Sequence, residues 1–144
     1  MVDVSDKAVT VREATAQGYL YVDSAVIVQI SEEKIAKGDV FAVARIAGIQ
    51  GAKRCSELIP LCHPLALSKV DIRFDIDKEA SRIKAECYCK LSGKTGVEME
   101  ALTGVNIALL TLFDMCKAID PAMRIENVRV VEKKGGKTGH WQQA

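Results

Sequence analysis

Two runs of alternating residues in the middle of the chain constrain its fold more than any other feature. Apolar side chains alternate with polar ones in residues 70–76, and they do so again in residues 83–91 after a short polar turn. Because successive side chains of a strand point to opposite faces, this period indicates two strands that are each buried on one face. The short turn between them predicts an antiparallel hairpin.

A helical repeat lies on each side of this hairpin. Asp39 is a favourable N-cap, and apolar or small residues recur at helical spacing through residues 40–58. The small residues predict that a neighbouring element packs closely against this helix, and Gly48 and Gly51 need such a packing reason. A longer helical repeat follows the hairpin in residues 97–119, and it predicts the longest element of the chain.

Two further strands complete the predicted fold. Residues 19–30 are rich in β-branched and aromatic types, and residues 124–132 suggest a last strand before a loosely ordered tail, 134–144. The order strand, helix, strand, strand, helix, strand is that of the ferredoxin-like split βαβ fold. We therefore expect one α+β domain over residues 1–144, with an antiparallel sheet and two helices on one face.

The charge balance narrows the classes of partner. Twenty Lys and Arg residues face nineteen Asp and Glu residues, which gives a formal charge of +1. Without a global basic field, neither nucleic acid nor a membrane surface is an expected partner, and any phosphate-binding site must be local. The sequence shows no apolar region of a signal peptide, and its five cysteines follow no disulfide framework. We expect a cytoplasmic protein with reduced thiols.

The second helical repeat also bears on assembly. Residues 108–119 are apolar almost all round, and such a helix must be covered on more than one side. In a two-layer domain one side faces outward, so we expect another subunit to cover it in a homo-oligomer.

Two familiar kinds of site do not fit the spacing of the residues. The Gly-Lys-Thr triplets at Gly93 and Gly136 lack the glycine that a P-loop has five residues earlier. Cys87 and Cys89, taken together with the pair Cys62-His63, match no known spacing of zinc ligands. Burial on one face of a strand explains Cys87 and Cys89 better than metal binding does. We therefore expect no metal site.

Several ionisable residues remain as candidates. His63 lies on a loop stiffened by two prolines, where a functional and a structural role are equally open. Glu98 and Glu100 begin the second helix, where the helix dipole favours carboxylates without any further role. Asp114 lies near the end of that helix, where the dipole disfavours an anion, and Lys117 is on the same face. The pattern favours a functional acid-base pair.

Longer motifs in a fixed order carry a resemblance to a known family. They are Lys-Gly-Asp-Val-Phe-Ala-Val-Ala-Arg-Ile-Ala-Gly-Ile from Lys37, Leu-Ile-Pro-Leu-Cys-His-Pro-Leu from Leu58, Lys-Thr-Gly-Val-Glu-Met-Glu-Ala-Leu-Thr from Lys94, Asp-Met-Cys-Lys-Ala from Asp114 and Gly-Gly-Lys-Thr-Gly from Gly135. Together they resemble the cyclic pyranopterin monophosphate synthase family, also called molybdenum cofactor biosynthesis protein C.

The resemblance implies a lyase that acts on a small GTP-derived substrate. It would convert 3',8-cyclo-7,8-dihydroguanosine 5'-triphosphate to cyclic pyranopterin monophosphate and diphosphate, in molybdenum cofactor biosynthesis. The resemblance also implies a homohexamer, built as a trimer of dimers, with active sites between subunits. No cofactor is called for, and the sequence leaves open whether a divalent ion accompanies the triphosphate.

The resemblance also assigns site residues by motif. The implied catalytic residues are Asp114, Lys117, Lys37 and Lys133. The implied substrate-binding residues are Leu61, Cys62, His63, Glu98, Met99 and Glu100. Carboxylates and amines suit the proton transfers of such a ring rearrangement, and clustered lysines suit the charge of departing diphosphate.

Two other functions are possible for the same fold class. An RNA-recognition domain would stack bases on aromatic side chains of its sheet, but the predicted middle strands offer only Phe74 and Tyr88. An acylphosphatase-like hydrolase shares the topology. Since the fold alone names no function, only an assay with the substrate separates the three.

Overall fold

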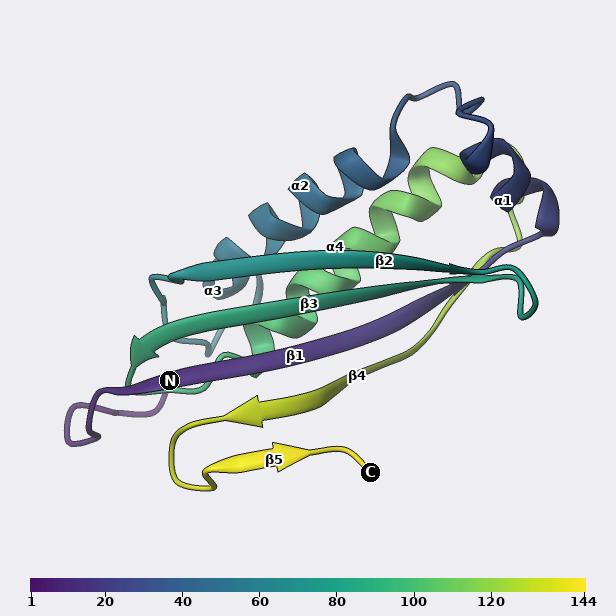
Figure 1. Ribbon diagram of the computed structural model, residues 1–144. Coiled ribbons are helices and arrows are strands. Elements are labelled where there is room, and N and C mark those ends of the chain that lie inside the picture. The colour runs from purple at the N-terminus through teal and green to yellow at the C-terminus, as the bar shows by residue number, and fades with distance from the viewer.

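The chain folds into one five-stranded sheet, with its two longer helices lying across the same face (Figure 1). The computed structural model describes residues 1–144. The elements in chain order are β1 (Thr10–Tyr21), α1 (Ser24–Ser31), α2 (Val40–Lys53), α3 (Cys55–Leu58), β2 (Lys69–Asp77), β3 (Arg82–Gly93), α4 (Glu98–Cys116), β4 (Arg124–Lys134) and β5 (His140–Gln142).

The order of the strands confirms the predicted fold class. Neighbours in the sheet run β2-β3-β1-β4-β5, and every pair is antiparallel. The first four strands have the split βαβ order, in which each helix connects two strands that are separated by a third. The α+β ferredoxin-like prediction, with both long helices on one face, is therefore confirmed.

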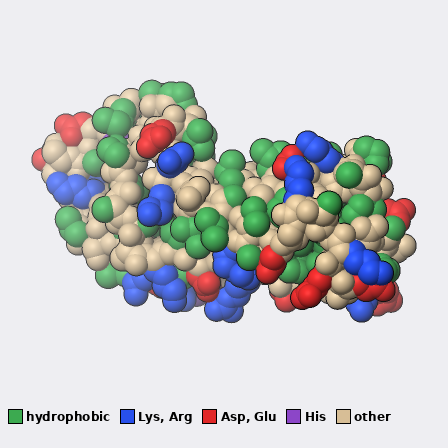
Figure 2. All heavy atoms as spheres, turned by 90° about the horizontal axis from the view of Figure 1, so that it is seen from above, with side chains coloured by type: hydrophobic (Ala, Val, Ile, Leu, Met, Phe, Trp, Pro, Cys, Tyr) green, Lys and Arg blue, Asp and Glu red, His purple; other side chains and the backbone are tan.

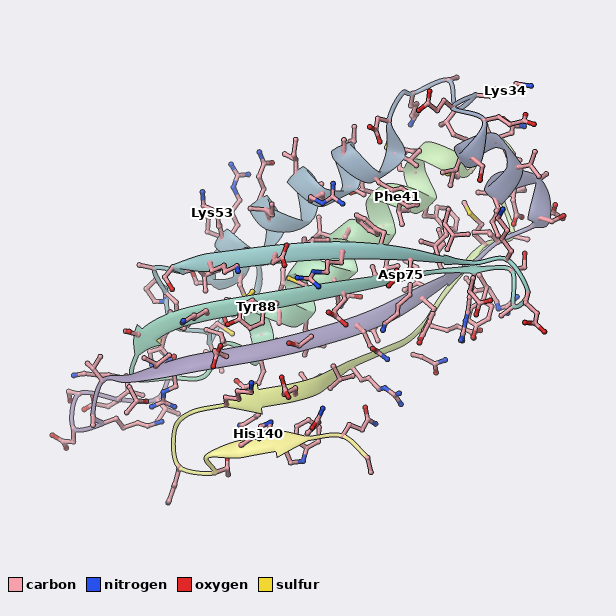
Figure 3. All side chains as sticks on the ribbon, in the orientation of Figure 1. Lys34, Phe41, Lys53, Asp75, Tyr88 and His140 are labelled. Atoms are coloured by element: carbon pink, nitrogen blue, oxygen red, sulfur yellow. The ribbon has the colours of Figure 1, made fainter.

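Alternating side chains place the core between the sheet and the helices. Along β1 every second residue from Arg12 to Leu20 is buried, and β3 shows the same alternation from Ile83 to Leu91. α2 packs on β2 through Phe41, which Figure 3 labels, and its ring stacks on that of Phe74 with ring centroids 5.0 Å apart. The opposite face of the sheet has no helix over it, and polar side chains cover it.

Two glycines allow α4 to approach both α2 and the sheet closely. A Cβ atom on Gly48 of α2 would lie 2.9 Å from the backbone oxygen of Gly104 on α4, and one on Gly104 would lie 2.6 Å from the sulfur of Cys87 on β3. Real Cβ atoms do not come so near to other heavy atoms. The close contact predicted for the first helix is therefore confirmed, and it is made with α4.

The outer surface of the helix layer keeps exposed apolar side chains. Val43 and Ile46 on α2 and Leu110 on α4 are between 44% and 58% exposed. Figure 2, which views the molecule from the side of the helices, shows hydrophobic side chains among charged ones on this surface. α4 is long and apolar enough to cross a membrane by composition alone, but nine of its 19 residues are buried against the sheet and α2. It is the core helix of the domain.

Three predictions of local structure were wrong. The first strand is residues 10–21 rather than 19–30, and residues 24–31 form α1, where Asp23 caps the helix by accepting a hydrogen bond from the backbone nitrogen of Ala25 at 2.9 Å. The predicted helix over residues 40–58 breaks at Arg54 into α2 and α3. The tail predicted to be loosely ordered contains β5, which pairs with the end of β4.

Candidate active site

The structure divides the predicted site residues between the two ends of α4. Lys37, Asp114 and Lys117 meet at its C-terminal end, whereas Glu98 and Lys133 meet at its N-terminal end. Asp114 lies sixteen positions after Glu98 on the helix, and at about 1.5 Å per position this is about 24 Å.

The first group, the Asp114 cluster, consists of Lys37, Asp114 and Lys117. The ammonium of Lys37 donates to Asp114 Oδ2 at 2.7 Å, and that of Lys117 donates to Oδ1 at 2.8 Å. Lys37 lies in the loop between α1 and α2, where Gly38 turns the backbone with a φ of +105°. All three side chains are about half exposed, with 51% to 55% of their surface accessible.

The two lysines shift the proton affinity of Asp114. The hydrogen bonds from Lys117 and Lys37 lower the pKa of Asp114 from 3.8 to about 2. The carboxylate therefore stays ionised at neutral pH, and it holds two ammonium groups side by side. The predicted pairing of Asp114 with Lys117 is present, while Lys37, which is 77 positions away in the sequence, joins them through the fold.

The second group, the Glu98 cluster, consists of Glu98, Lys133 and Arg12. Lys133 Nζ lies 2.8 Å from Glu98 Oε1, and both side chains are about two thirds buried. Burial acts to raise the pKa of Glu98, but the hydrogen bond from Lys133 and the charges of Lys133 and Arg12 outweigh it. The pKa of Glu98 is consequently lowered.

Glu100 is shifted in the opposite direction. Its residue is only 4% exposed, and this burial raises its pKa, as does the negative charge of Glu98 two residues earlier. Two carboxylates on the same turn of α4 thus differ in proton affinity, because one has a cationic partner and the other does not. Such divergence is typical of acid and base pairs in enzymes.

Arg12 is a functional candidate that the sequence analysis missed. Its residue is 8% exposed, its Nη2 donates to the backbone oxygen of Lys94 at 3.3 Å, and its Nε has no partner. The hydroxyl of Thr95 is also buried without a partner. Arg12 lies on the same buried face of β1 as Ala14. The alternation of buried residues along β1 could have identified it, but the strand was expected to start only at Tyr19.

The loop between Pro60 and Pro64, which carries Cys62 and His63, lies at the same end of α4 as the Glu98 cluster. Cys62 is a neighbour of Cys55, which in turn lies close to Glu100. His63 donates from Nε2 to the backbone oxygen of Val2 at 2.7 Å, so this side chain ties the N-terminal segment to the loop. The exposed apolar residues here are Leu61, at 71%, and Met99, at 37%.

The cysteines weighed as zinc ligands belong to the core. Cys87 and Cys89 are fully buried on the helix side of β3, with their sulfur atoms 3.9 Å apart, among the apolar residues of the main cluster. They are explained by packing alone.

A comparison with models of known protein families matches residues 1–136 to the MoaC family. The chain belongs to this family. The MoaC family is an enzyme family of molybdenum cofactor biosynthesis, so the chain has a role in that pathway. The resemblance inferred from the motifs is confirmed, and the matched region includes both clusters at the ends of α4.

Proposed function

We propose that the chain converts 3',8-cyclo-7,8-dihydroguanosine 5'-triphosphate to cyclic pyranopterin monophosphate and diphosphate, and is therefore a lyase. Membership of the MoaC family supports the pathway. The observation that carries the proposal is the pairing of the part-buried Glu98 with Lys133 at 2.8 Å, with Glu100, whose pKa is shifted in the opposite direction, two residues further along α4.

These carboxylates suit the proton transfers of the reaction. Opening the purine-derived ring and closing a pyrazine ring require protons to leave some nitrogen and carbon atoms and to arrive at others. Glu98, which is kept ionised by Lys133, can accept a proton, and Glu100, whose pKa is raised by burial, can donate one. Positioned groups of this kind contribute about 10²- to 10⁴-fold each to a rate.

The Asp114 cluster suits the phosphate chemistry. A sugar-derived hydroxyl attacks the innermost phosphorus atom, a new P–O bond forms, and the bond to the departing diphosphate breaks. Lys37 and Lys117 are half exposed and fixed by an ionised carboxylate, so they can bind the triphosphate and stabilise the charge that develops on diphosphate. With a net charge of +1, the chain depends on such local cations.

The separation of the clusters supports active sites between subunits. About 24 Å of helix keeps Glu98 and Asp114 of one protomer too far apart to act on one reacting ring and its phosphate. Two protomers that bring opposite helix ends together would complete a site. The exposed Val43, Ile46 and Leu110 offer an apolar surface for such contacts, in keeping with a homohexamer built as a trimer of dimers.

The first experiment is turnover. The purified protein is incubated with the cyclised GTP derivative, and cyclic pyranopterin monophosphate and diphosphate are quantified. Formation of both in equal amounts supports the proposal. An inert substrate, together with RNA binding or hydrolysis of acyl phosphates, would instead favour one of the two alternative functions.

A second experiment tests the shared site. Glu98→Gln and Asp114→Asn each remove one cluster, and we expect each variant alone to be nearly inactive. When the two are dissociated, mixed in equal amounts and reassembled, roughly a quarter of the sites combine two intact halves and activity returns. Mixed oligomers that remain inactive would show that both clusters must come from the same protomer.

A further inference from the structure

A cavity opens beside the Glu98 cluster, between the N-terminal end of α4 and the C-terminal strands. Its volume is 290 Å³, and it is lined by Glu98, Val130, Lys133, Thr138 and Trp141. Two of these residues, Thr138 and Trp141, come from the segment that the sequence analysis expected to be loosely ordered, and they lie beyond the region matched to the MoaC family.

The pairing of β5 with β4 places Trp141 on the wall of this cavity. Trp141 lies directly opposite Lys133 in the sheet, and Lys133 in turn lies opposite the buried Ala14 of β1. Paired residues of neighbouring strands share a face, so Lys133 and Trp141 both lie on the helix side of the sheet. All three residues of β5 are exposed, Trp141 at 44%.

The turn that carries β5 is closed by a backbone hydrogen bond between two glycines. The backbone nitrogen of Gly135 donates to the oxygen of Gly139 at 2.7 Å, and both residues adopt positive φ values, which favour glycine. Gly136 lies against the guanidinium of Arg12, which a Cβ atom at this position would meet. The turn thus folds back onto the Glu98 cluster and holds Trp141 beside it.

The lining of the cavity fits a planar heterocycle. An indole ring offers an apolar face on which another aromatic ring can stack, while a carboxylate and an ammonium can bind polar atoms at the edge of that ring. The volume is at the lower end of ligand cavities, which begin at roughly 300 Å³. It therefore suits a bicyclic ring rather than a whole nucleoside triphosphate.

We propose that Trp141 is a specificity-determining residue that stacks on the guanine-derived ring of the substrate, with Glu98 and Lys133 at the edge of that ring. The identity of the ring rests on the function proposed above. The stacking itself rests on the cavity and on the register of β5. A structural role for the side chain is a weaker explanation, because it is nearly half exposed on a three-residue strand.

The chain offers a direct probe, since Trp141 is its only tryptophan. GTP serves as a planar ligand that carries a triphosphate, and inorganic triphosphate serves as the control without a ring. We expect GTP to quench the fluorescence of the assembled protein in a saturable way, and inorganic triphosphate to leave it unchanged. Binding of GTP, measured by calorimetry, without a change in tryptophan emission would overturn the proposal.

Variants give the second measurement. Stacking of one base on an aromatic side chain corresponds to about 1–3 kcal/mol, so Trp141→Ala should raise the Kd for GTP about 5- to 150-fold. It should also raise KM for the cyclised substrate far more than it lowers kcat. Trp141→Phe should retain most of the affinity. His140→Ala is the matched control, because His140 is the neighbour on β5 that pairs with Glu132 instead (Figure 3).

The two proposals can fail separately. If the wild-type protein turns over the cyclised substrate while Trp141→Ala binds GTP and substrate as tightly as wild type, the stacking role is wrong and the proposed function stands. If the wild type does not turn over the substrate but GTP quenches Trp141 and the Ala variant loses affinity, the ring site is right and the proposed reaction is wrong.

Discussion

Replacing Asp114 with Asn tests the role of the Asp114 cluster most sharply. The change keeps the shape of the side chain but removes the negative charge that Lys37 and Lys117 share at 2.7 and 2.8 Å. Lys37 and Lys117 donate to different carboxylate oxygens, and one of these becomes an NH2 group that cannot accept, so one of the two hydrogen bonds is lost. The two cations lose the anion that holds them together, and we expect turnover to fall by about 10²-fold or more, the contribution of one positioned group.

The same change should barely affect stability at neutral pH. The side chains of the cluster are 51% to 55% exposed, and ion pairs with this much access to water contribute little to folding. The pKa of Asp114 is lowered from 3.8 to about 2, so whatever stability it contributes is fully present above about pH 4 and is lost as pH falls toward 2. Any difference in melting temperature between Asp114→Asn and wild type should therefore shrink in that acid range.

Turnover and thermal unfolding are measured on the same samples. The matched control is Asp71→Asn, which removes a surface carboxylate 3.2 Å from Arg73 on β2 and should leave turnover unchanged. Near-normal turnover per folded site in Asp114→Asn would refute the role assigned to the cluster. A large drop in melting temperature at neutral pH would instead show that the cluster is structural.

Two further predictions concern the core and the second carboxylate. Leu109 is fully buried on α4 where the helix crosses β1, so Leu109→Ala should lower the free energy of unfolding by about 2.7–5 kcal/mol, and a loss below about 1 kcal/mol in denaturant titration would contradict this packing. Because the pKa of Glu100 is raised in the folded protein, its contribution to stability is present below the ordinary carboxyl pKa and is lost as pH rises through the folded value. Glu100→Gln should therefore raise the melting temperature at neutral pH but not at about pH 4. Turnover of this variant should fall. Equal shifts at both pH values would show that the gain does not come from the charge.

How far the fold was predictable depended on what each element contacts. The β2–β3 hairpin was predicted because its apolar residues are large and alternate regularly. β1 was missed because several of its inward residues are small, so its sequence lacks the regular alternation of large apolar side chains. Small side chains are needed there because α4 packs closely: a Cβ on Gly18 would lie 2.7 Å from Leu109. α1 was mistaken for strand because its β-branched residues favour strands, while Asp23 and the burial of Ile27 favour the helix.

The site was predictable only where its residues are close in sequence. Asp114 and Lys117 are three positions apart on one helix, and helical spacing alone brought them together. Lys37 and Lys133 come close to Asp114 and Glu98 only through the tertiary fold, and the family resemblance named these lysines without showing which carboxylate each one contacts. Neither the helical spacing nor the resemblance could show that the Asp114 and Glu98 clusters lie at opposite ends of α4, because this depends on the direction of the helix relative to the sheet.

The short β5 strand also bears on how the protein avoids aggregation. β4 presents an edge of 11 residues, and an open edge of that length is a template for strands of other chains. β5 pairs with the last three of its residues, Glu132 to Lys134, and so shortens the open part of this edge to residues 124–131. At the opposite border, β2 directs charged side chains such as Lys69, Arg73 and Asp75 away from the core. Both borders thus carry features that discourage the addition of a further strand.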